Sequence, residues 1–86
     1  MFIDEREKGF LKAVAKTAIS KGLKPWKEVL GEDVDFEFAN GDEMFEILKD
    51  LRKKGLYIDC SSYRDNQNWV RVTKKGYELI KNELQV

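Results

Sequence analysis

Apolar residues recur at helical spacing through the first part of the chain. Between residues 4 and 21 they fall at i, i+3, i+4 and i+7, which is the stripe of an amphipathic helix. The stripe consists of Leu11, Val14, Ala15 and Ala18. Asp4 followed three residues later by Glu7 is the pattern of a capping box, and Gly22 before an apolar residue is typical of a helix C-terminus. The pattern predicts a helix over residues 4–21.

Residues 25–38 contain two further patterns of apolar residues, the first with helical spacing and the second alternating. Pro25 suits the first position of a helix, and the apolar residues after it predict a short second helix over residues 25–30 that stops at Gly31. Apolar and acidic residues then alternate, which predicts a strand over residues 33–38 with one face in water. The alternating residues are Asp33, Val34, Asp35, Phe36, Glu37 and Phe38.

A third helix is predicted after Asn40, which stands three residues before Glu43 in a second capping pattern. Its apolar stripe is Met44, Ile47, Leu48 and Leu51. The sequence Lys53-Lys54-Gly55 is typical of a helix end, because cations complement the helix dipole and glycine suits the cap.

The last third of the chain predicts a hairpin and a closing helix. Leu56, Ile58 and Cys60 alternate with polar residues, as do Val70 and Val72, and polar residues typical of a turn lie between the two segments. These five apolar residues are expected to share the inner face of two strands. Thr73 is expected to cap a final helix whose apolar side is Tyr77, Ile80 and Leu84, with Gly76 allowing its first turn a close approach.

Most aromatic side chains are expected in the core, where large apolar residues contribute most to packing. This group is Phe10, Trp26, Phe36, Phe38, Phe45 and Tyr77. Tyr63 and Trp69 fall on the opposite side of the hairpin from Val70 and Val72, so both are expected on its outer face. Cys60 is interpreted as a small buried apolar residue.

Composition narrows the function classes. The 86 residues suit one domain spanning 1–86, and the chain contains no histidine and one cysteine. Histidine is the usual neutral-pH base and the commonest metal ligand, so no catalytic residue, metal or cofactor is expected and the protein is not expected to be an enzyme. A lone cysteine makes no internal disulfide, and neither a signal peptide nor a membrane span is recognised. A cytoplasmic location is expected.

The segment from Met44 to Leu84 resembles the C-terminal half of winged-helix proteins. The resemblance rests on Leu51-Arg52-Lys53-Lys54-Gly55-Leu56-Tyr57-Ile58 and on Val70-Arg71-Val72-Thr73-Lys74-Lys75-Gly76-Tyr77-Glu78-Leu79. It implies an α+β winged helix: a three-helix core, a small antiparallel β-hairpin wing and a C-terminal helix. It also implies a DNA-binding transcription regulator, whose third helix enters the major groove and whose wing follows the backbone.

Charge is distributed unevenly along a chain that is neutral overall. Residues 28–48 contain eight acidic residues and no Lys or Arg, whereas residues 1–27 contain seven basic and three acidic residues. Residues 49–86 contain nine basic and five acidic residues. Since DNA affinity comes largely from cations that neutralise phosphates, the acidic start of the third helix is a departure from the usual pattern.

Two functions are therefore predicted, each with its own residues. Double-stranded DNA would be bound by the basic and polar residues of the helix ends and wing: Arg52, Lys53, Lys54, Arg64, Asn66, Gln67, Arg71, Lys74 and Lys75. The alternative is a protein-protein interaction module that binds a basic protein through Asp33, Asp35, Glu37, Tyr63 and Trp69. The apolar residues 1–3 are expected to dock either on the domain's own core or on a second subunit, and the second alternative predicts a homodimer formed through the terminal segment.

Overall fold

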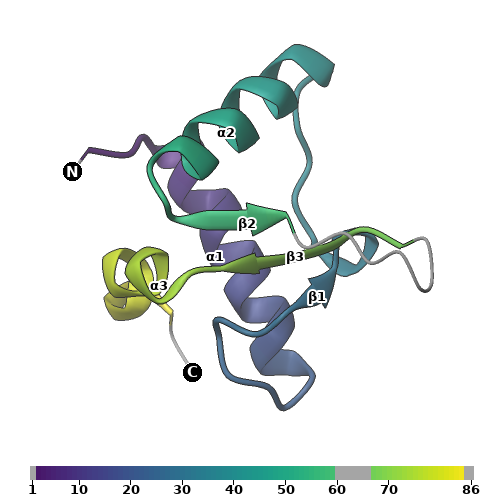
Figure 1. Cartoon of the computed structure of the whole chain (residues 1–86), viewed down its shortest axis with the longest axis vertical. Helices are drawn as coiled ribbons and strands as arrows, with labels where there is room; N and C mark the ends of the chain where they lie inside the picture. Colours follow the sequence, from purple (N-terminus) through teal and green to yellow (C-terminus); the bar gives the residue numbers. More distant parts are fainter. Residues whose placement is uncertain (1, 60–66, 85–86) are drawn as a thin grey trace.

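The computed structural model describes residues 2–59 and 67–84, and these form an α+β fold of three α-helices and a small antiparallel sheet (Figure 1). The elements in chain order are α1 (Glu5–Ser20), β1 (Val29–Leu30), the 3₁₀ turn η1 (Gly31–Asp33), α2 (Gly41–Lys53), β2 (Tyr57–Asp59), β3 (Trp69–Val72), α3 (Lys74–Ile80) and the 3₁₀ turn η2 (Lys81–Glu83). Within these residues no helix is both long and apolar enough to cross a membrane.

The sheet has the strand order β1-β3-β2, so the last strand in sequence lies in the middle. Val29 pairs with Val70 on one side of β3, and Tyr57 pairs with Val72 on the other. In Figure 1, α1 passes behind the sheet, α2 lies above it and α3 follows β3 at one end. One cluster of buried side chains from α1, α2, the strands and α3 forms the core.

The predicted N-terminal helix is confirmed as α1. The Glu7 amide donates to Asp4 Oδ1 over 2.8 Å and the Asp4 amide donates to Glu7 Oε1 over 3.1 Å, so both halves of the capping box form. At the other end Gly22 has a φ of 77°, and the next amide donates back to Ala18 O. These contacts place the apolar stripe of α1 in the core.

The predicted second helix is wrong. Residues 25–27 form a turn, and the final pair, Val29 and Leu30, forms strand β1. A helix of two turns is marginal in isolation. When Val29 and Leu30 pair with β3 they form the hydrogen bonds of the sheet, and Val29 becomes completely buried. These residues are therefore more stable in the sheet than in a short helix.

The predicted strand at residues 33–38 is also wrong, although its alternation is kept. Phe36 and Phe38 turn inward and pack their rings on Phe10, with centroid distances of 5.6 and 5.5 Å. No strand within the described residues pairs with this segment. The alternation of apolar and acidic residues therefore indicates that one side of an extended segment is buried. It does not indicate a strand of the sheet.

The third helix and the closing helix are confirmed as α2 and α3, with Asn40 and Thr73 as their N-caps. Gly76 comes so close to Leu56 O that a Cβ at this position would collide with it, which confirms the predicted close approach. The closing helix is therefore fixed against the residue that follows the end of α2.

The two predicted hairpin strands are confirmed as β2 and β3, but the inner face of β2 was assigned one residue out of step. Tyr57 is buried, opposite Val72, and Ile58 is exposed, opposite Arg71. Leu56 is also buried, but it enters the core from the cap of α2 and not from the strand. Cys60, the third residue of the predicted inner face, lies outside the described residues.

Candidate functional site

Four of the predicted DNA-binding cations lie on the last turn of α2 and the first turn of α3. The Thr73 hydroxyl donates to Gly55 O over 2.8 Å, and the Thr73 amide donates to Leu56 O over 3.1 Å. These bonds bring two helix ends together although they are separated in sequence by the two strands. The exposed cations beside this junction are Arg52, Lys53, Lys74 and Lys75, and we call them the basic seam.

Lys54, another predicted DNA-binding cation, is engaged in contacts within the domain. Its ammonium lies 2.8 Å from Asp50 Oδ2, 2.8 Å from Phe2 O and 3.5 Å from Glu7 Oε1. The Asp50 and Glu7 carboxyls raise the pKa of Lys54 above its ordinary value. Lys54 thus joins α2 to the N-terminal segment and is not available to the basic seam without losing these contacts.

The remaining predicted DNA-binding residues lie toward the hairpin. Arg71 is partly buried on the sheet face that also carries Ile58, and Gln67 is exposed just before β3. Arg64 and Asn66 lie outside the described residues. The predicted DNA-binding residues within the described ranges are therefore spread over α2, α3, β3 and the residues before β3.

The predicted acidic surface is partly neutralised within the chain. Asp33 forms an ion pair of 2.9 Å with Lys21, and the carbonyl of Glu37 accepts a 2.8 Å hydrogen bond from Arg6. Trp69 is partly buried opposite Leu30, and Tyr63 lies outside the described residues. Asp35 and Glu37 are exposed, and the start of the acidic segment lies beside β3, where the Gly31 amide donates to Asn68 O over 2.8 Å.

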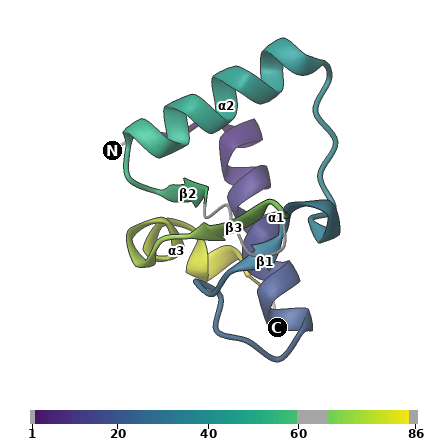
Figure 2. The ribbon, with the colours of Figure 1, turned by 45° about the vertical axis from the view of Figure 1, so that its right-hand side comes forward.

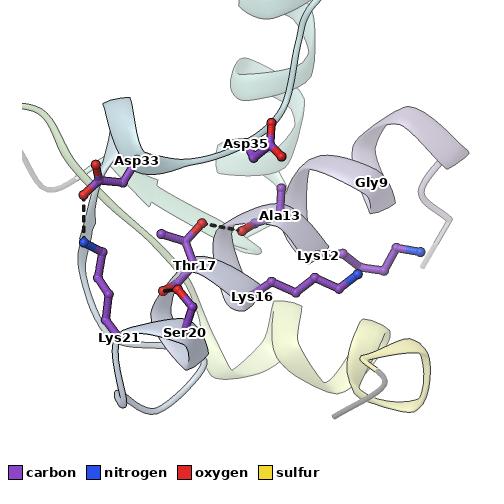
Figure 3. Close-up of a pocket in the computed structure, with 9 residues that line it drawn as sticks. All are labelled: Gly9, Lys12, Ala13, Lys16, Thr17, Ser20, Lys21, Asp33 and Asp35. Atoms are coloured by element: carbon purple, nitrogen blue, oxygen red, sulfur yellow. Dashed lines mark hydrogen bonds and ion pairs between the residues drawn. The ribbon is translucent and has the colours of Figure 1, made fainter.

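An open groove of about 620 Å³ runs between α1 and the start of the acidic segment (Figure 3). It is lined by Gly9, Lys12, Ala13, Lys16, Thr17, Ser20, Lys21, Asp33 and Asp35. The Thr17 hydroxyl donates to Ala13 O, and that of Ser20 donates to Thr17 O, both over 2.8 Å. Because cations, carboxylates and already bonded hydroxyls are mixed along it, the groove has no single charge that would select a ligand.

A buried carboxyl lies on the opposite side of the same helix. The Glu7 side chain is 5% exposed, and its Oε2 has no hydrogen-bond partner among the described residues. Burial, reinforced by the nearby Asp50 carboxyl, raises the pKa of Glu7 above its ordinary value. Hydrogen bonding to Glu7 and to Lys54 lowers the pKa of Asp50. Burial thus disfavours the ionised form of Glu7, whereas the neighbours of Asp50 favour its ionised form.

The carboxyls near Glu7 do not form a metal site in the part of the chain described here. A small pocket is lined by Asp4, Glu7, Glu46, Ile47 and Asp50. No group of three or more His, Cys, Asp or Glu side chains in residues 2–59 and 67–84 is placed to hold a metal ion. The Lys54 ammonium already supplies positive charge there.

The outward side of α2 carries apolar residues that the sequence analysis assigned to the core. Met44 is 44% exposed and Phe45 is 58% exposed, so both assignments are wrong, and Leu48 is only partly buried. Ile47 and Leu51 are the only residues of α2 that are buried. We call Met44, Phe45, Leu48, Lys49 and Arg52 the outer face of α2.

The signal for this surface is present in the sequence. At about 100° per residue, the five apolar positions of α2 cover an arc wider than the stripe that a helix lying on one side of a small core can bury. Comparisons of the chain with family models, with curated proteins and with solved structures find no significant match. What the protein binds is therefore inferred from its surface chemistry.

Proposed function

We propose that the chain is a winged-helix-type domain that binds another protein through the outer face of α2. The winged-helix assignment is supported by the order of α1, β1, α2, the β2–β3 pair and α3, and by the strand order β1-β3-β2. In this assignment α2 is the recognition helix and the β2–β3 pair is the base of the wing.

The observation that carries the proposal is the exposure of two large apolar side chains on α2. Phe45 and Met44 are 58% and 44% exposed, and Lys49 packs over the Phe45 ring at 5.6 Å from its centroid. Grouped apolar side chains rimmed by charge are typical of protein-binding surfaces, in which aromatic anchors contribute most of the affinity. Phosphates offer nothing for these side chains to pack on.

Two further features argue against docking of α2 in the major groove. The segment directly before α2 is not the α-helix of a helix-turn-helix, because residues 31–40 contain only the 3₁₀ turn η1 and an extended stretch. The first turns of α2 expose Asp42 and Glu46, and Glu43 is paired with Arg6 at 2.7 Å. Acidic groups at this end would repel the phosphates on either side of the groove.

The proposal is tested by placing a photo-cross-linking amino acid, p-benzoylphenylalanine, at position 45 of the full chain in cells. A control chain carries it at position 79, because Leu79 is also exposed but lies on α3. We expect a discrete cross-linked protein from position 45, identified by mass spectrometry, that is absent from position 79. Equal products from both positions, or none from position 45, would refute the proposal.

DNA binding is the second candidate function, and the basic seam favours it. Arg52, Lys53, Lys74 and Lys75 are exposed, and none forms an ion pair with a residue that the structure describes. Lys74 also lies over the Trp26 ring, 5.4 Å from its centroid. A duplex held here would contact the ends of two helices through its phosphates, without α2 entering the groove.

A further inference from the structure

Four exposed charges along α2 are arranged symmetrically in sequence. Asp42 and Glu46 lie in the first half of the helix, and Lys49 and Lys53 lie in the second half. Their spacings are four, three and four residues, so the order reads acid, acid, base, base about a midpoint between Ile47 and Leu48. At about 100° per residue, all four fall within an arc of roughly 60°. They form one stripe beside the outer face of α2.

The acidic half of this charge stripe lies toward the N-terminal end of α2 and the basic half toward the C-terminal end, so each half complements the helix dipole. None of the four side chains of the stripe forms an ion pair with any residue in the described part of the chain. Asp42 and Glu46 are like charges four residues apart, as are Lys49 and Lys53, and such pairs destabilise a helix. The stripe is therefore open to a partner that carries the same charges in the opposite order.

We propose that the partner of the outer face of α2 is a second copy of this chain, with the two α2 helices packed antiparallel about a twofold axis. The inference rests on the proposed function, because it uses the same surface. In an antiparallel pair, Asp42 of each chain faces Lys53 of the other, and Glu46 faces Lys49. All four like-charge contacts are then offset by opposite charges across the interface.

The apolar side of α2 fits the same arrangement. A twofold axis perpendicular to two antiparallel helices brings each flank of one helix against the same flank of the other. The charge stripe therefore meets the charge stripe, while on the other flank Leu48 meets its own copy beside the axis and Met44 lies near Leu48 of the other chain. Phe45 and Arg52 lie between the flanks, where an Arg can stack on the partner's ring.

The rest of the fold leaves room for this pairing. In Figures 1 and 2, α2 lies at one edge of the domain, with α1 and the sheet on one side of it and no element on the other. A pair of 13-residue helices is smaller than a standard interface of about 1,600 Å². We therefore expect a dimer that dissociates on dilution, with register set by charge.

Charge swaps test the inference in sedimentation equilibrium over a wide concentration range. Lys49→Glu/Lys53→Glu makes the stripe wholly acidic, and Asp42→Lys/Glu46→Lys makes it wholly basic. We expect the wild-type chain to dimerise and each swap alone to weaken self-association by at least about tenfold. An equimolar mixture of the two swaps is expected to form a 1:1 heterodimer, because every antiparallel pairing is then between opposite charges.

The matched control is Lys16→Glu/Lys24→Glu, which makes the same charge change at exposed lysines outside α2 and should leave dimerisation unchanged. Circular dichroism shows whether each variant folds. If a swap does not fold, Phe45→Ser is the second variant, since an exposed side chain contributes little to folding. Phe45→Ser is expected to weaken the dimer at least about tenfold as well.

Three results would overturn the inference. They are a wild-type chain that stays monomeric throughout, folded variants that dimerise like wild type, and swaps that do not combine when mixed. The cross-linking experiment separates these failures from failure of the proposed function. A product from position 45 with twice the mass of the chain supports self-pairing, whereas a product containing a different protein leaves the proposed function standing and removes the second copy.

Discussion

The side-chain hydroxyl of Thr73 donates a 2.8 Å hydrogen bond to the carbonyl of Gly55, and it accepts a 3.0 Å hydrogen bond from the amide of Gly76. One oxygen thus caps α3 and joins it to the residue that ends α2. Gly55 itself has a φ of 75°, the left-handed conformation that glycine adopts most easily. The relation between the two helices depends on this short set of contacts.

Removing this hydroxyl should be costly. We expect Thr73→Ala to lower the free energy of unfolding by about 1 to 2 kcal/mol, since it removes an N-cap and a second hydrogen bond. Thr73→Ser keeps the oxygen and should cost less than about half of that. Urea denaturation measures both, and an alanine variant as stable as wild type would show that the cap contributes nothing.

Gly76→Ala should destabilise the protein even though alanine favours helices. The added Cβ would collide with Leu56 O and lie 2.9 Å from Val72 Cγ1, and the cost of such overpacking is about 1 to 3 kcal/mol. Gly41→Ala is the control, because nothing lies within 4 Å of its Cβ position. It should change the unfolding free energy by no more than about 1 kcal/mol. Equal effects at both positions would contradict the close approach of α3.

The buried carboxyl of Glu7 predicts a pH-dependent stability. Because its pKa is raised in the folded state, folding favours the protonated form, so stability is lost as pH rises from the ordinary glutamate pKa of about 4.3 through the raised pKa. Glu7→Gln cannot ionise, and its carbonyl oxygen can still accept the hydrogen bond from the Asp4 amide. We expect this variant to be more stable than wild type at pH 7, by a margin that shrinks toward pH 4 in urea titrations. A margin that does not vary with pH would refute this assignment.

The orientation of α2 can be checked by paired truncations. Leu51 is completely buried, so Leu51→Ala should cost about 2 to 5 kcal/mol of unfolding free energy. Phe45→Ala removes a larger side chain from an exposed position, and at protein concentrations where the chain is monomeric it should cost less than about 1 kcal/mol. The reverse order would mean that the outer face of α2 is buried.

Salt dependence tests the DNA candidate. If the basic seam holds a duplex, binding should be detectable near 50 mM salt and should weaken steeply as salt rises. Lys74→Gln/Lys75→Gln should then reduce the slope of log K against log salt by about two, whereas Lys16→Gln/Lys21→Gln, on α1 and at its C-cap, should leave it unchanged. A wild-type chain that does not retain duplex DNA near 50 mM salt would remove this function.

The sequence predicted α1, α2, α3 and the paired strands because each has a strong local signal, such as the capping pairs at Asp4 and Asn40. The errors come from elements decided by tertiary contacts. Whether Val29 is helical or extended depends on a strand 41 residues later, and no local pattern contains that information. The alternation in residues 33–38 was real, but alternation alone does not distinguish a strand from an extended segment that packs without pairing.

The candidate surface was predicted less well than the fold. The helix-end cations were identified from their sequence position, but the contacts of Thr73 with Gly55 and Leu56, which connect the end of α2 to α3, have no signal in the local sequence. Met44 and Phe45 were assigned to the core because large apolar side chains tend to be buried. Hydrophobicity alone does not show whether a side chain is buried in its own domain or against a partner. A 13-residue helix at the edge of a small domain cannot bury five apolar residues against its own chain.

The central position of β3 has a consequence for how the protein is made. Both outer strands need β3, and the ribosome synthesises it after α1, β1 and α2. Until Trp69 to Val72 emerge, the nascent chain has no partner for Val29 and no lining for one side of α1. Translation that stops before these residues yields no smaller version of the fold, and such fragments should be rapidly cleared by cellular proteases.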